Sequence, residues 1–236
     1  MAALSREARC KALAQGSLFA SARSERLEEL GAAAHSQKLA KGEELFHKGD
    51  EGSQIYAVVS GRLKALTTSR EGDDVVFSIL GPGEVFGEIA LLRGTRRTAT
   101  VTALEACELL VIHRREFLDF LRREPDVAIG MLGVLAGRIE RLSEWVEDTL
   151  FLNLPLRLAK KLMILGERYG EETPAGLRID LKLSQEEWGD LVGTTRESIN
   201  KQLRAWTEEG LITIDHGYIV IHDKRGLEKL AGAVVY

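Results

Sequence analysis

Residues 86–101, FGEIALLRGTRRTATV, carry the strongest signal in this 236-residue chain. Gly87 and Glu88 precede a short apolar helical turn. The first turn of a helix leaves backbone N–H groups without partners, and these groups favour a bound anion. Arg97 is the residue type that pairs with phosphate, and Thr98 adds a hydroxyl donor. The stretch therefore predicts a phosphate site between a short helix and the strand that follows it.

The glutamate of this stretch needs a separate explanation. A carboxylate at Glu88 would repel a phosphate bound beside it, so Glu88 is better placed on a sugar hydroxyl. One ligand that carries both phosphate and ribose accounts for Glu88 and Arg97 together. An internal ion pair between Glu88 and Arg97 accounts for them equally well, and their spacing does not separate the two interpretations.

The sequence around this stretch is rich in strands. From Leu39 to Ile112 short runs of β-branched and aromatic residues alternate with glycine turns, which predicts an antiparallel sandwich or barrel. Residues 24–39 have helical composition, and we expect them to pack on one end of it. The turn glycines are Gly42, Gly49, Gly52, Gly61, Gly72, Gly81 and Gly83.

After Pro125 the apolar period changes to alternating spacings of three and four. This seam predicts a long helix over residues 129–149 that pairs with the same helix of a second chain. A single amphipathic helix lying on its own β-domain remains the alternative. Three glycines weaken the helix by about 1 kcal/mol each relative to alanine. The seam residues are Leu132, Leu135, Ile139, Leu142, Val146 and Thr149, and the glycines are Gly130, Gly133 and Gly137.

The last third of the chain has the element order of a winged helix-turn-helix. Pro155 suits the first turn of a new helix, and it follows a predicted hinge at residues 153–154. SQEEWGDLVG opens with a capping box, Ser184 with Glu187 three residues later. A second helix over residues 194–210 and a hairpin over 211–221 then complete the motif.

The second helix of this motif supplies the candidate DNA-reading residues. Arg196 can donate two hydrogen bonds to guanine, and Glu197 can accept one from cytosine. The other members of the predicted DNA surface, which contact bases or phosphates, are Thr195, Ser198, Asn200, Lys201, Gln202 and Arg204. An α-helical hairpin with ordinary surface charges is the alternative.

Composition limits the function further. The hydrophobic content of 44% suffices for packed cores, and the net charge of −4 requires any DNA contact to come from a local patch. No apolar run reaches the length of a membrane span, and the charged N-terminus excludes a signal peptide, so we expect a cytoplasmic protein. Cys10 and Cys107 cannot build a zinc site or an iron–sulfur cluster, and the histidines form no haem or metal pattern. We therefore expect no metal and no enzyme active site.

Three stretches resemble known motifs. FGEIALLRGTRRTATV resembles the phosphate-binding cassette of cyclic-nucleotide-binding domains, and KGEELFHKGDEGSQIYAVVSGRLKA is similar to the strands that precede it. LSQEEWGDLVGTTRESINKQLRAWTEEGLI resembles the helix-turn-helix of bacterial cyclic-AMP receptor and fumarate-nitrate regulators. The resemblance extends over about residues 17–222.

This resemblance implies an α+β chain of three parts. The parts are a cyclic-nucleotide-binding β jelly roll at residues 1–124, a dimerisation helix and hinge at 125–153, and a winged helix-turn-helix at 154–236. It further implies a homodimeric transcription factor that binds palindromic double-stranded DNA and works with RNA polymerase. The implied effector is cyclic AMP or cyclic GMP, with cyclic AMP favoured. The alternatives are a regulator that needs no cyclic nucleotide or answers to another effector and, less favoured, a nucleotide-hydrolysing enzyme.

The resemblance also assigns roles to individual residues. Glu88 binds the ribose 2′-hydroxyl, and Arg97 with Thr98 binds the cyclic phosphate. Arg196 and Glu197 read a G·C pair in a TGTGA-like half-site, and Lys201 takes the place of a second base-reading arginine. Backbone contacts come from Gly87, Ile89 and Ala90, and the long helix adds Arg138, Leu142 and Ser143. Since Leu142 replaces one of the family's two adenine-binding residues, the preferred base stays open.

Overall fold

The computed structural model describes residues 4–232. The chain divides into two compact units, Met1–Thr68 with Phe77–Arg141 and Ser69–Val76 with Leu142–Tyr236. Among residues 4–232, no helix combines the length and the apolar character that a membrane span requires.

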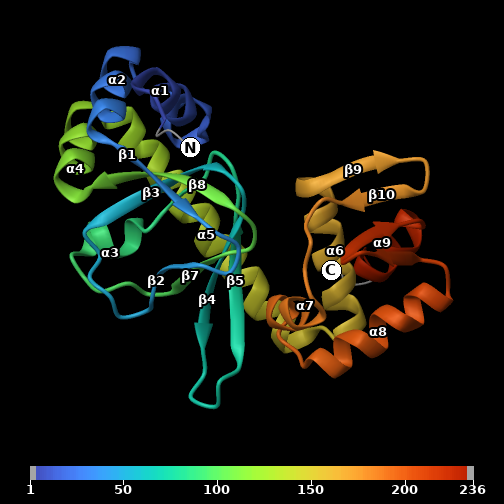
Figure 1. The fold of residues 1–236 in the computed structure, drawn as a ribbon. Helices are drawn as coiled ribbons and strands as arrows, with labels where there is room; N and C mark the ends of the chain where they lie inside the picture. Colours follow the sequence, from blue (N-terminus) through green and yellow to red (C-terminus); the bar gives the residue numbers. More distant parts are fainter. Residues whose placement is uncertain (1–3, 233–236) are drawn as a thin grey trace. The chain divides into compact units, whose positions relative to one another are not determined.

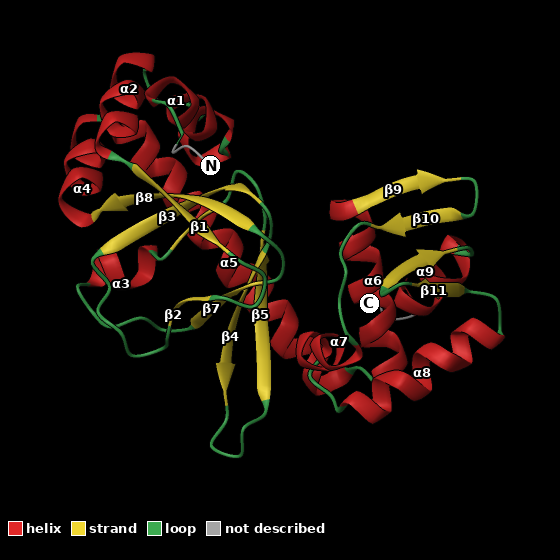
Figure 2. Ribbon diagram, viewed as in Figure 1, coloured by secondary structure: helices red, strands yellow, loops and turns green. Residues whose placement is uncertain are grey.

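The first unit is built around two four-stranded sheets, drawn in yellow in Figure 2. Their strand orders are β1-β8-β3-β6 and β2-β7-β4-β5, and one apolar cluster contains side chains from both sheets. This arrangement confirms the predicted β jelly roll. The strands are β1 His35–Leu39, β2 Glu44–Phe46, β3 Gln54–Ser60, β4 Leu63–Thr68, β5 Asp74–Leu80, β6 Val85–Phe86, β7 Thr100–Ala103 and β8 Cys107–His113.

Alternate side chains of β3 point to opposite faces of its sheet, so this strand contributes to two apolar clusters. Tyr56 and Val58 belong to the cluster shared by the two sheets, whereas Ile55 and Ala57 belong to a second cluster under the helices. Successive side chains of a strand point to opposite faces, so a run of apolar residues predicts a strand covered on both sides.

Five helices, α1 to α5, and a helical turn contribute to this second cluster, α3 through Leu91. Figure 1 shows α1, α2 and α4 gathered at one end of strands β1, β3 and β8. The long helix α5 adds its buried first turns to the same cluster through Val127 and Met131. The elements are α1 Arg6–Gln15, η1 Ser17–Phe19, α2 Ser24–Ala33, α3 Glu88–Arg93, α4 Arg114–Arg123 and α5 Pro125–Phe151.

The prediction that residues 24–39 are helical is wrong in its second half. Helix α2 ends at Ala33, and His35–Leu39 forms strand β1, which pairs with Cys107–Val111 of β8. Leu39 at the end of β1 is buried between the sheets. Differences in helix or strand propensity between residues other than proline are at most about 1 kcal/mol, so pairing with a distant strand overrides the helical propensity of these residues.

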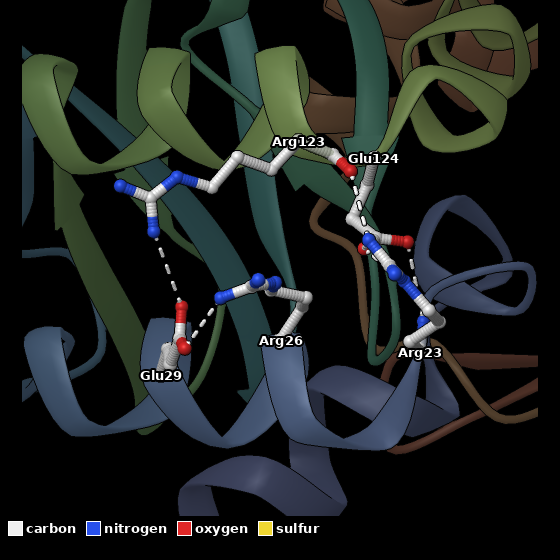
Figure 3. Close-up of polar contacts among 5 residues, drawn as sticks. All are labelled: Arg23, Arg26, Glu29, Arg123 and Glu124. Atoms are coloured by element: carbon white, nitrogen blue, oxygen red, sulfur yellow. Dashed lines mark hydrogen bonds and ion pairs between the residues drawn. The ribbon is translucent and has the colours of Figure 1, made fainter.

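Charged side chains join α2 to the corner between α4 and α5 (Figure 3). Glu124 is the residue between the end of α4 and the start of α5, and it is only 5% exposed. It accepts hydrogen bonds from the Arg23 backbone N–H at 3.3 Å and from Arg23 Nε at 2.7 Å. Arg23 Nη2 also donates to the Arg123 carbonyl oxygen at 3.1 Å. Glu29 pairs with Arg26 at 2.5 Å and with Arg123 at 3.6 Å. The network holds the start of α5 against α2.

Replacing Glu124 with glutamine is expected to make the protein less stable at pH 7 and to have little effect in acid. The hydrogen bond from Arg23 holds the pKa of Glu124 below its ordinary value. A carboxyl whose pKa is lower in the folded state stabilises the fold above its unfolded pKa of about 4.3, and this contribution is lost as the pH falls through the folded value. Urea unfolding of both proteins as a function of pH measures the difference.

The matched control for this change is Glu28→Gln. Glu28 is exposed on the same helix, α2. The control should leave the urea midpoint unchanged at every pH. A Glu124→Gln protein that unfolds at the same urea concentration as the unaltered protein at pH 7 would show that the pair with Arg23 contributes nothing to stability.

The second unit contains the predicted winged helix-turn-helix. Its sheet has the strand order β11-β12-β10-β9, and the wing hairpin of β11 and β12 turns at His216 and Gly217, whose φ angles are 50° and 91°. Strand β9 was not predicted. The elements are α6 Leu154–Tyr169, β9 Gly170–Thr173, β10 Gly176–Ile179, α7 Gln185–Val192, α8 Arg196–Glu208, β11 Ile212–Asp215, β12 Tyr218–Ile221 and α9 Lys224–Gly232.

Local capping chemistry accounts for the helix boundaries in this unit. The capping box is confirmed, since Ser184 Oγ accepts from the Glu187 backbone N–H at 3.2 Å and Glu187 Oε2 accepts from the Ser184 backbone N–H at 2.7 Å. Helix α7 ends at Gly193, whose φ of 74° is left-handed and costs glycine little. Asn153 caps α6 by accepting from the Leu156 backbone N–H at 3.2 Å, which confirms the predicted break in front of Pro155.

Candidate ligand site and nucleic-acid interface

The predicted phosphate site starts at the turn between β6 and the short helix α3, Glu88–Arg93. Gly87 caps this helix with a φ of 87°, a left-handed conformation that side chains other than glycine rarely adopt. A Cβ atom at Gly87 would lie 2.7 Å from Arg97 Nη1. Glycine is therefore required here both for the turn and for the close approach of the arginine.

Arg97 is buried at the centre of the site, with 4% of its surface exposed. Its Nη1 donates to the Gly87 carbonyl oxygen at 3.1 Å, and its Nη2 donates to the Gln54 carbonyl oxygen at 2.9 Å. Burial lowers the pKa of Arg97, but arginine stays charged in proteins. Within the described part of the chain, the Nε donor of this buried cation has no hydrogen-bond partner. A buried guanidinium with an unused donor is suited to an incoming anion.

Glu88 is also buried, with 2% of its surface exposed, and its partner comes from α5. Arg138 Nη1 forms an ion pair and hydrogen bond with Glu88 Oε1, and Arg138 Nη2 donates to the Val85 carbonyl oxygen at 2.6 Å. Among residues 4–232, no ion pair joins Glu88 directly to Arg97. The internal pair that the spacing allowed is thus replaced by a pair with the long helix.

The remaining predicted ligand residues divide into two groups. Thr98 directly follows Arg97 and is exposed, Ile89 of α3 is 41% exposed, and Ala90 is buried at 2%. Leu142 and Ser143 are exposed residues of α5 that belong to the second unit. The structure therefore brings together the cassette and Arg138, and the role of Leu142 and Ser143 stays a prediction.

Two aromatic residues at this site were missed by the sequence reasoning. The Arg97 guanidinium carbon lies 4.2 Å from the centre of the Phe46 ring and 5.3 Å from the centre of the Tyr56 ring. Both residues occupy strand positions at which an aromatic side chain is ordinary, so no sequence signal distinguishes them.

The described residues 4–232 contain no group of three or more histidine, cysteine, aspartate or glutamate side chains that could hold a metal ion. Cys10 and Cys107 are both free thiols. Burial raises the pKa of the Cys107 thiol, which favours its inert, protonated form.

Helix α8 presents a polar face as the sequence predicted. Thr195 caps the helix by accepting from the Ser198 backbone N–H at 3.3 Å. Buried Ile199, Leu203 and Trp206 hold the opposite face in the unit's core. Of the predicted DNA-contacting side chains, Thr195, Arg196, Glu197, Asn200, Lys201 and Arg204 are exposed, and Ser198 and Gln202 are half-buried.

A contact between the two helices of the motif was not predicted. Gln185, the first residue of α7, donates from Nε2 to Asn200 Oδ1 at 3.2 Å. The two residues lie fifteen positions apart on different helices. This hydrogen bond uses one of the two lone pairs of Asn200 Oδ1, and the other lone pair and the amide N–H groups are suited to a nucleic acid.

Comparison with known proteins matches both regions. A family model described as a cyclic nucleotide-binding domain matches residues 36–124, and a model described as a Crp-like helix-turn-helix domain matches residues 156–230. The chain is 31% identical over 191 residues to the cyclic AMP receptor protein of Thermus thermophilus, covering 81% of this chain and 85% of that protein. It is 30% identical over 193 residues to the cAMP-activated global transcriptional regulator CRP of Escherichia coli O157:H7, covering 81% of this chain and 91% of that protein.

A solved structure has the same fold. The c-di-GMP-responsive global regulator CLP of Xanthomonas campestris superimposes with a TM-score of 0.75 at 21% identity, covering 85% of this chain and 99% of that one. The first matched region of the chain contains Glu88 and Arg97, and the second contains helix α8.

Proposed function

The chain belongs to the cyclic-AMP receptor and fumarate-nitrate regulator (CRP/FNR) family of DNA-binding transcription regulators, and from this premise we propose that it is a homodimer controlled by a cyclic nucleotide. The observation that carries the proposal is the buried pair of charges in the cassette. Glu88 and Arg97 are 2% and 4% exposed, and the Arg97 Nε donor is without a partner in residues 4–232. A ligand with a phosphate for Arg97 and a ribose hydroxyl for Glu88 satisfies both groups.

Cyclic AMP is the favoured nucleotide, and cyclic GMP is the second. The Thermus thermophilus and Escherichia coli relatives are a cyclic AMP receptor and a cAMP-activated regulator by name. Thr98, which follows Arg97 and is exposed, is available to the phosphate or to the base. Ser143 of α5 retains a hydroxyl for the base, whereas Leu142 offers none.

Glu88 and Arg138 supply a route from the ligand to the long helix. A ribose hydroxyl that donates to Glu88 shares its carboxylate with Arg138, which contacts Oε1. The ligand therefore binds with different strength to conformations that differ in the position of α5, and only such a difference shifts their populations. We propose that the hinge at Asn153, between α5 and α6, passes this change to the DNA-binding domain.

The exposed seam of α5 supports the homodimer. A helix that packed only on its own β-domain would hide its apolar stripe, yet five large apolar residues in residues 129–149 are at least 43% exposed. They are Ile129, Leu132, Ile139, Leu142 and Val146. Pairing two copies along this stripe removes it from water. The two α8 helices then face successive major grooves about 34 Å apart on palindromic DNA. RNA polymerase is the further partner that we propose from the family.

Two other functions have less support. The fold alone does not decide the effector, because CLP, with the same fold, is a c-di-GMP-responsive regulator. This chain can therefore be a regulator with a different effector. Hydrolysis of the nucleotide would need a metal or a nucleophile with its base, and Glu88 and Arg97 are instead engaged by Arg138 and by backbone carbonyl groups.

Calorimetric titration of the purified full-length chain with cyclic AMP, cyclic GMP and cyclic di-GMP tests the proposal. We expect cyclic AMP to bind with a Kd in the micromolar range or tighter and cyclic GMP to bind more weakly. If cyclic di-GMP alone binds, the protein is still a DNA-binding regulator, but its effector is cyclic di-GMP and not cyclic AMP. If none of the three produces heat or competes for the site, cyclic-nucleotide control is wrong for this protein.

A further inference from the structure

Three aromatic rings from both sheets form a cluster, and two of them lie next to the Arg97 guanidinium. Phe46 is the last residue of β2, Tyr56 lies in β3 and Phe86 ends β6. The Tyr56 and Phe86 rings stack with their centres 5.3 Å apart, and the Phe46 ring centre lies 5.6 Å from that of Tyr56 and 6.4 Å from that of Phe86. We refer to Phe46, Tyr56 and Phe86 as the aromatic seat.

Two rings of the aromatic seat lie next to the Arg97 guanidinium, and backbone carbonyl groups accept from its terminal nitrogens. Phe46 is the closest ring, 4.2 Å from the guanidinium carbon, against 5.3 Å for Tyr56. The Gly87 and Gln54 carbonyl oxygens accept from the two terminal nitrogens. Together these contacts hold the guanidinium in one orientation and leave Nε as the nitrogen that has no hydrogen-bond partner in the described residues.

Contacts within the seat make this orientation rigid. Tyr56 and Phe86 are each 4% exposed, so they cannot turn away without opening the core. The Tyr56 hydroxyl donates to Gln54 Oε1 at 2.9 Å, and the backbone carbonyl of the same Gln54 holds Arg97. Burial raises the pKa of Tyr56, so its hydroxyl keeps the proton that it donates.

We propose that Phe46 is a positioning residue, whose ring holds the Arg97 guanidinium face-on so that Nε is presented to an anion. The inference rests on the proposed function in one respect, which is that the anion is the phosphate of a cyclic nucleotide. A ring attracts a cation through its negative face, which an aliphatic side chain of similar bulk does not offer. The ring also excludes water from the cation, which strengthens its attraction to an anion.

Phe46 is the ring to change because it is half-buried and the closest to Arg97, whereas Tyr56 is part of the closed core. Phe46→Leu keeps an apolar side chain and removes the ring, and Phe46→Tyr keeps the ring. Phe77→Leu is the matched control. Phe77 is 46% exposed on β5, at the edge of the same sheet opposite to β2.

The first measurement is the proton–nitrogen NMR signal of Arg97 Nε in the full-length protein, identified by its loss in Arg97→Lys. We expect Phe46→Leu to move this signal, because the ring current is gone, and to speed the exchange of its proton with water. Phe46→Tyr and Phe77→Leu should preserve the signal. The second measurement is calorimetric titration with cyclic AMP and cyclic GMP. Phe46→Leu should weaken the binding of either nucleotide about tenfold, and the other two variants should stay within about twofold.

The outcomes separate the inference from the proposed function. A merely structural Phe46 would lower the urea unfolding midpoint in Phe46→Leu while the exchange rate of the Arg97 Nε proton and the nucleotide affinity stayed as they are, and that result overturns the inference. If the unaltered protein binds neither nucleotide, cyclic-nucleotide control fails and inorganic phosphate becomes the probe. The inference then holds if phosphate shifts the Arg97 Nε signal in the unaltered protein but not in Phe46→Leu, and it is overturned if the two proteins respond alike or neither responds.

Discussion

Replacing Arg97 with glutamine should weaken the binding of cyclic AMP by more than about 100-fold. A hydrogen bond to a charged group contributes about 1.5–3 kcal/mol, and the variant loses such bonds together with the buried cation of the cassette. Arg138 cannot substitute for it, since Arg138 is 26% exposed and is engaged by Glu88. Glutamine is shorter and neutral, so it cannot replace both Nη contacts and reach the phosphate. Titration calorimetry of the unaltered protein and the variant measures this loss.

The fold should survive this change. A glutamine amide can keep one of the two hydrogen bonds that Arg97 makes to the Gly87 and Gln54 carbonyl oxygens. Loss of the other costs about 1 kcal/mol, which lowers the melting temperature by about 2–4 °C in a protein of this size. Circular dichroism on heating checks this.

The neighbouring arginine provides the matched control. Arg96 is exposed and donates from Nη1 to the Gly49 carbonyl oxygen at 2.7 Å. Arg96→Gln removes the same charge one residue away and should leave the affinity for cyclic AMP unchanged. Equal losses in both variants would mean that net charge, and not the position of Arg97, is what the ligand requires. Unchanged binding in Arg97→Gln would refute its phosphate role outright.

Replacing Arg196 with alanine should remove sequence-specific DNA binding, with a loss of about 100-fold or more on an operator built from two TGTGA-like half-sites. Arg196 is the first residue of α8 and is exposed. A bidentate contact from arginine to guanine contributes about 1–3 kcal/mol, and a dimer loses two of them. Fluorescence anisotropy with this operator and with a scrambled duplex, in the presence and absence of cyclic AMP, measures the effect.

Arg204→Ala separates base reading from phosphate binding. Arg204 lies exposed two turns later on α8, in a position predicted to contact phosphate. Its loss should weaken binding to the operator and to the scrambled duplex alike. The slope of the logarithm of the binding constant against the logarithm of the salt concentration should become shallower by about one unit for each phosphate contact removed. If Arg196→Ala also weakens both duplexes equally, Arg196 contacts the backbone and the predicted readout is wrong.

Short-range chemistry explains what the sequence predicted correctly. The capping box of Ser184 and Glu187, the left-handed Gly193 and the Asn153 cap in front of Pro155 each depend on residues within a few positions of one another. The same holds for the helix that starts after Gly87. Such features can be predicted because the residues that satisfy each backbone group are neighbours in the chain.

The contacts that define the ligand site are of a different kind. Glu88 and its partner Arg138 are fifty residues apart, and Arg97 meets Phe46 from another strand. Alignment with the family assigned Arg138 to the site, but nothing local could have paired it with Glu88. Nothing in the sequence marked Phe46 as a residue of the ligand site, because aromatic residues are common in strands.

Two of the elements that the prediction omitted, β9 and α4, were missed for different reasons. Strand β9, Gly170–Thr173, reads GEET, which is a poor strand sequence, and it exists as an edge strand paired with β10. Helix α4 differs, since Phe117 and Phe120 lie three residues apart and are both buried. Such spacing is typical of a helix, so α4 could have been predicted from the sequence.

The pair between Glu88 and Arg138 gives the buried carboxylate a counter-charge from the chain itself. A buried carboxylate that depended on a visiting molecule would leave the empty protein with an uncompensated charge, and its folding would be tied to the supply of that molecule. Here Arg138 supplies the counter-charge of Glu88 from within the chain. Over evolutionary time such a regulator can exchange its signal molecule, or give it up, without first losing its fold.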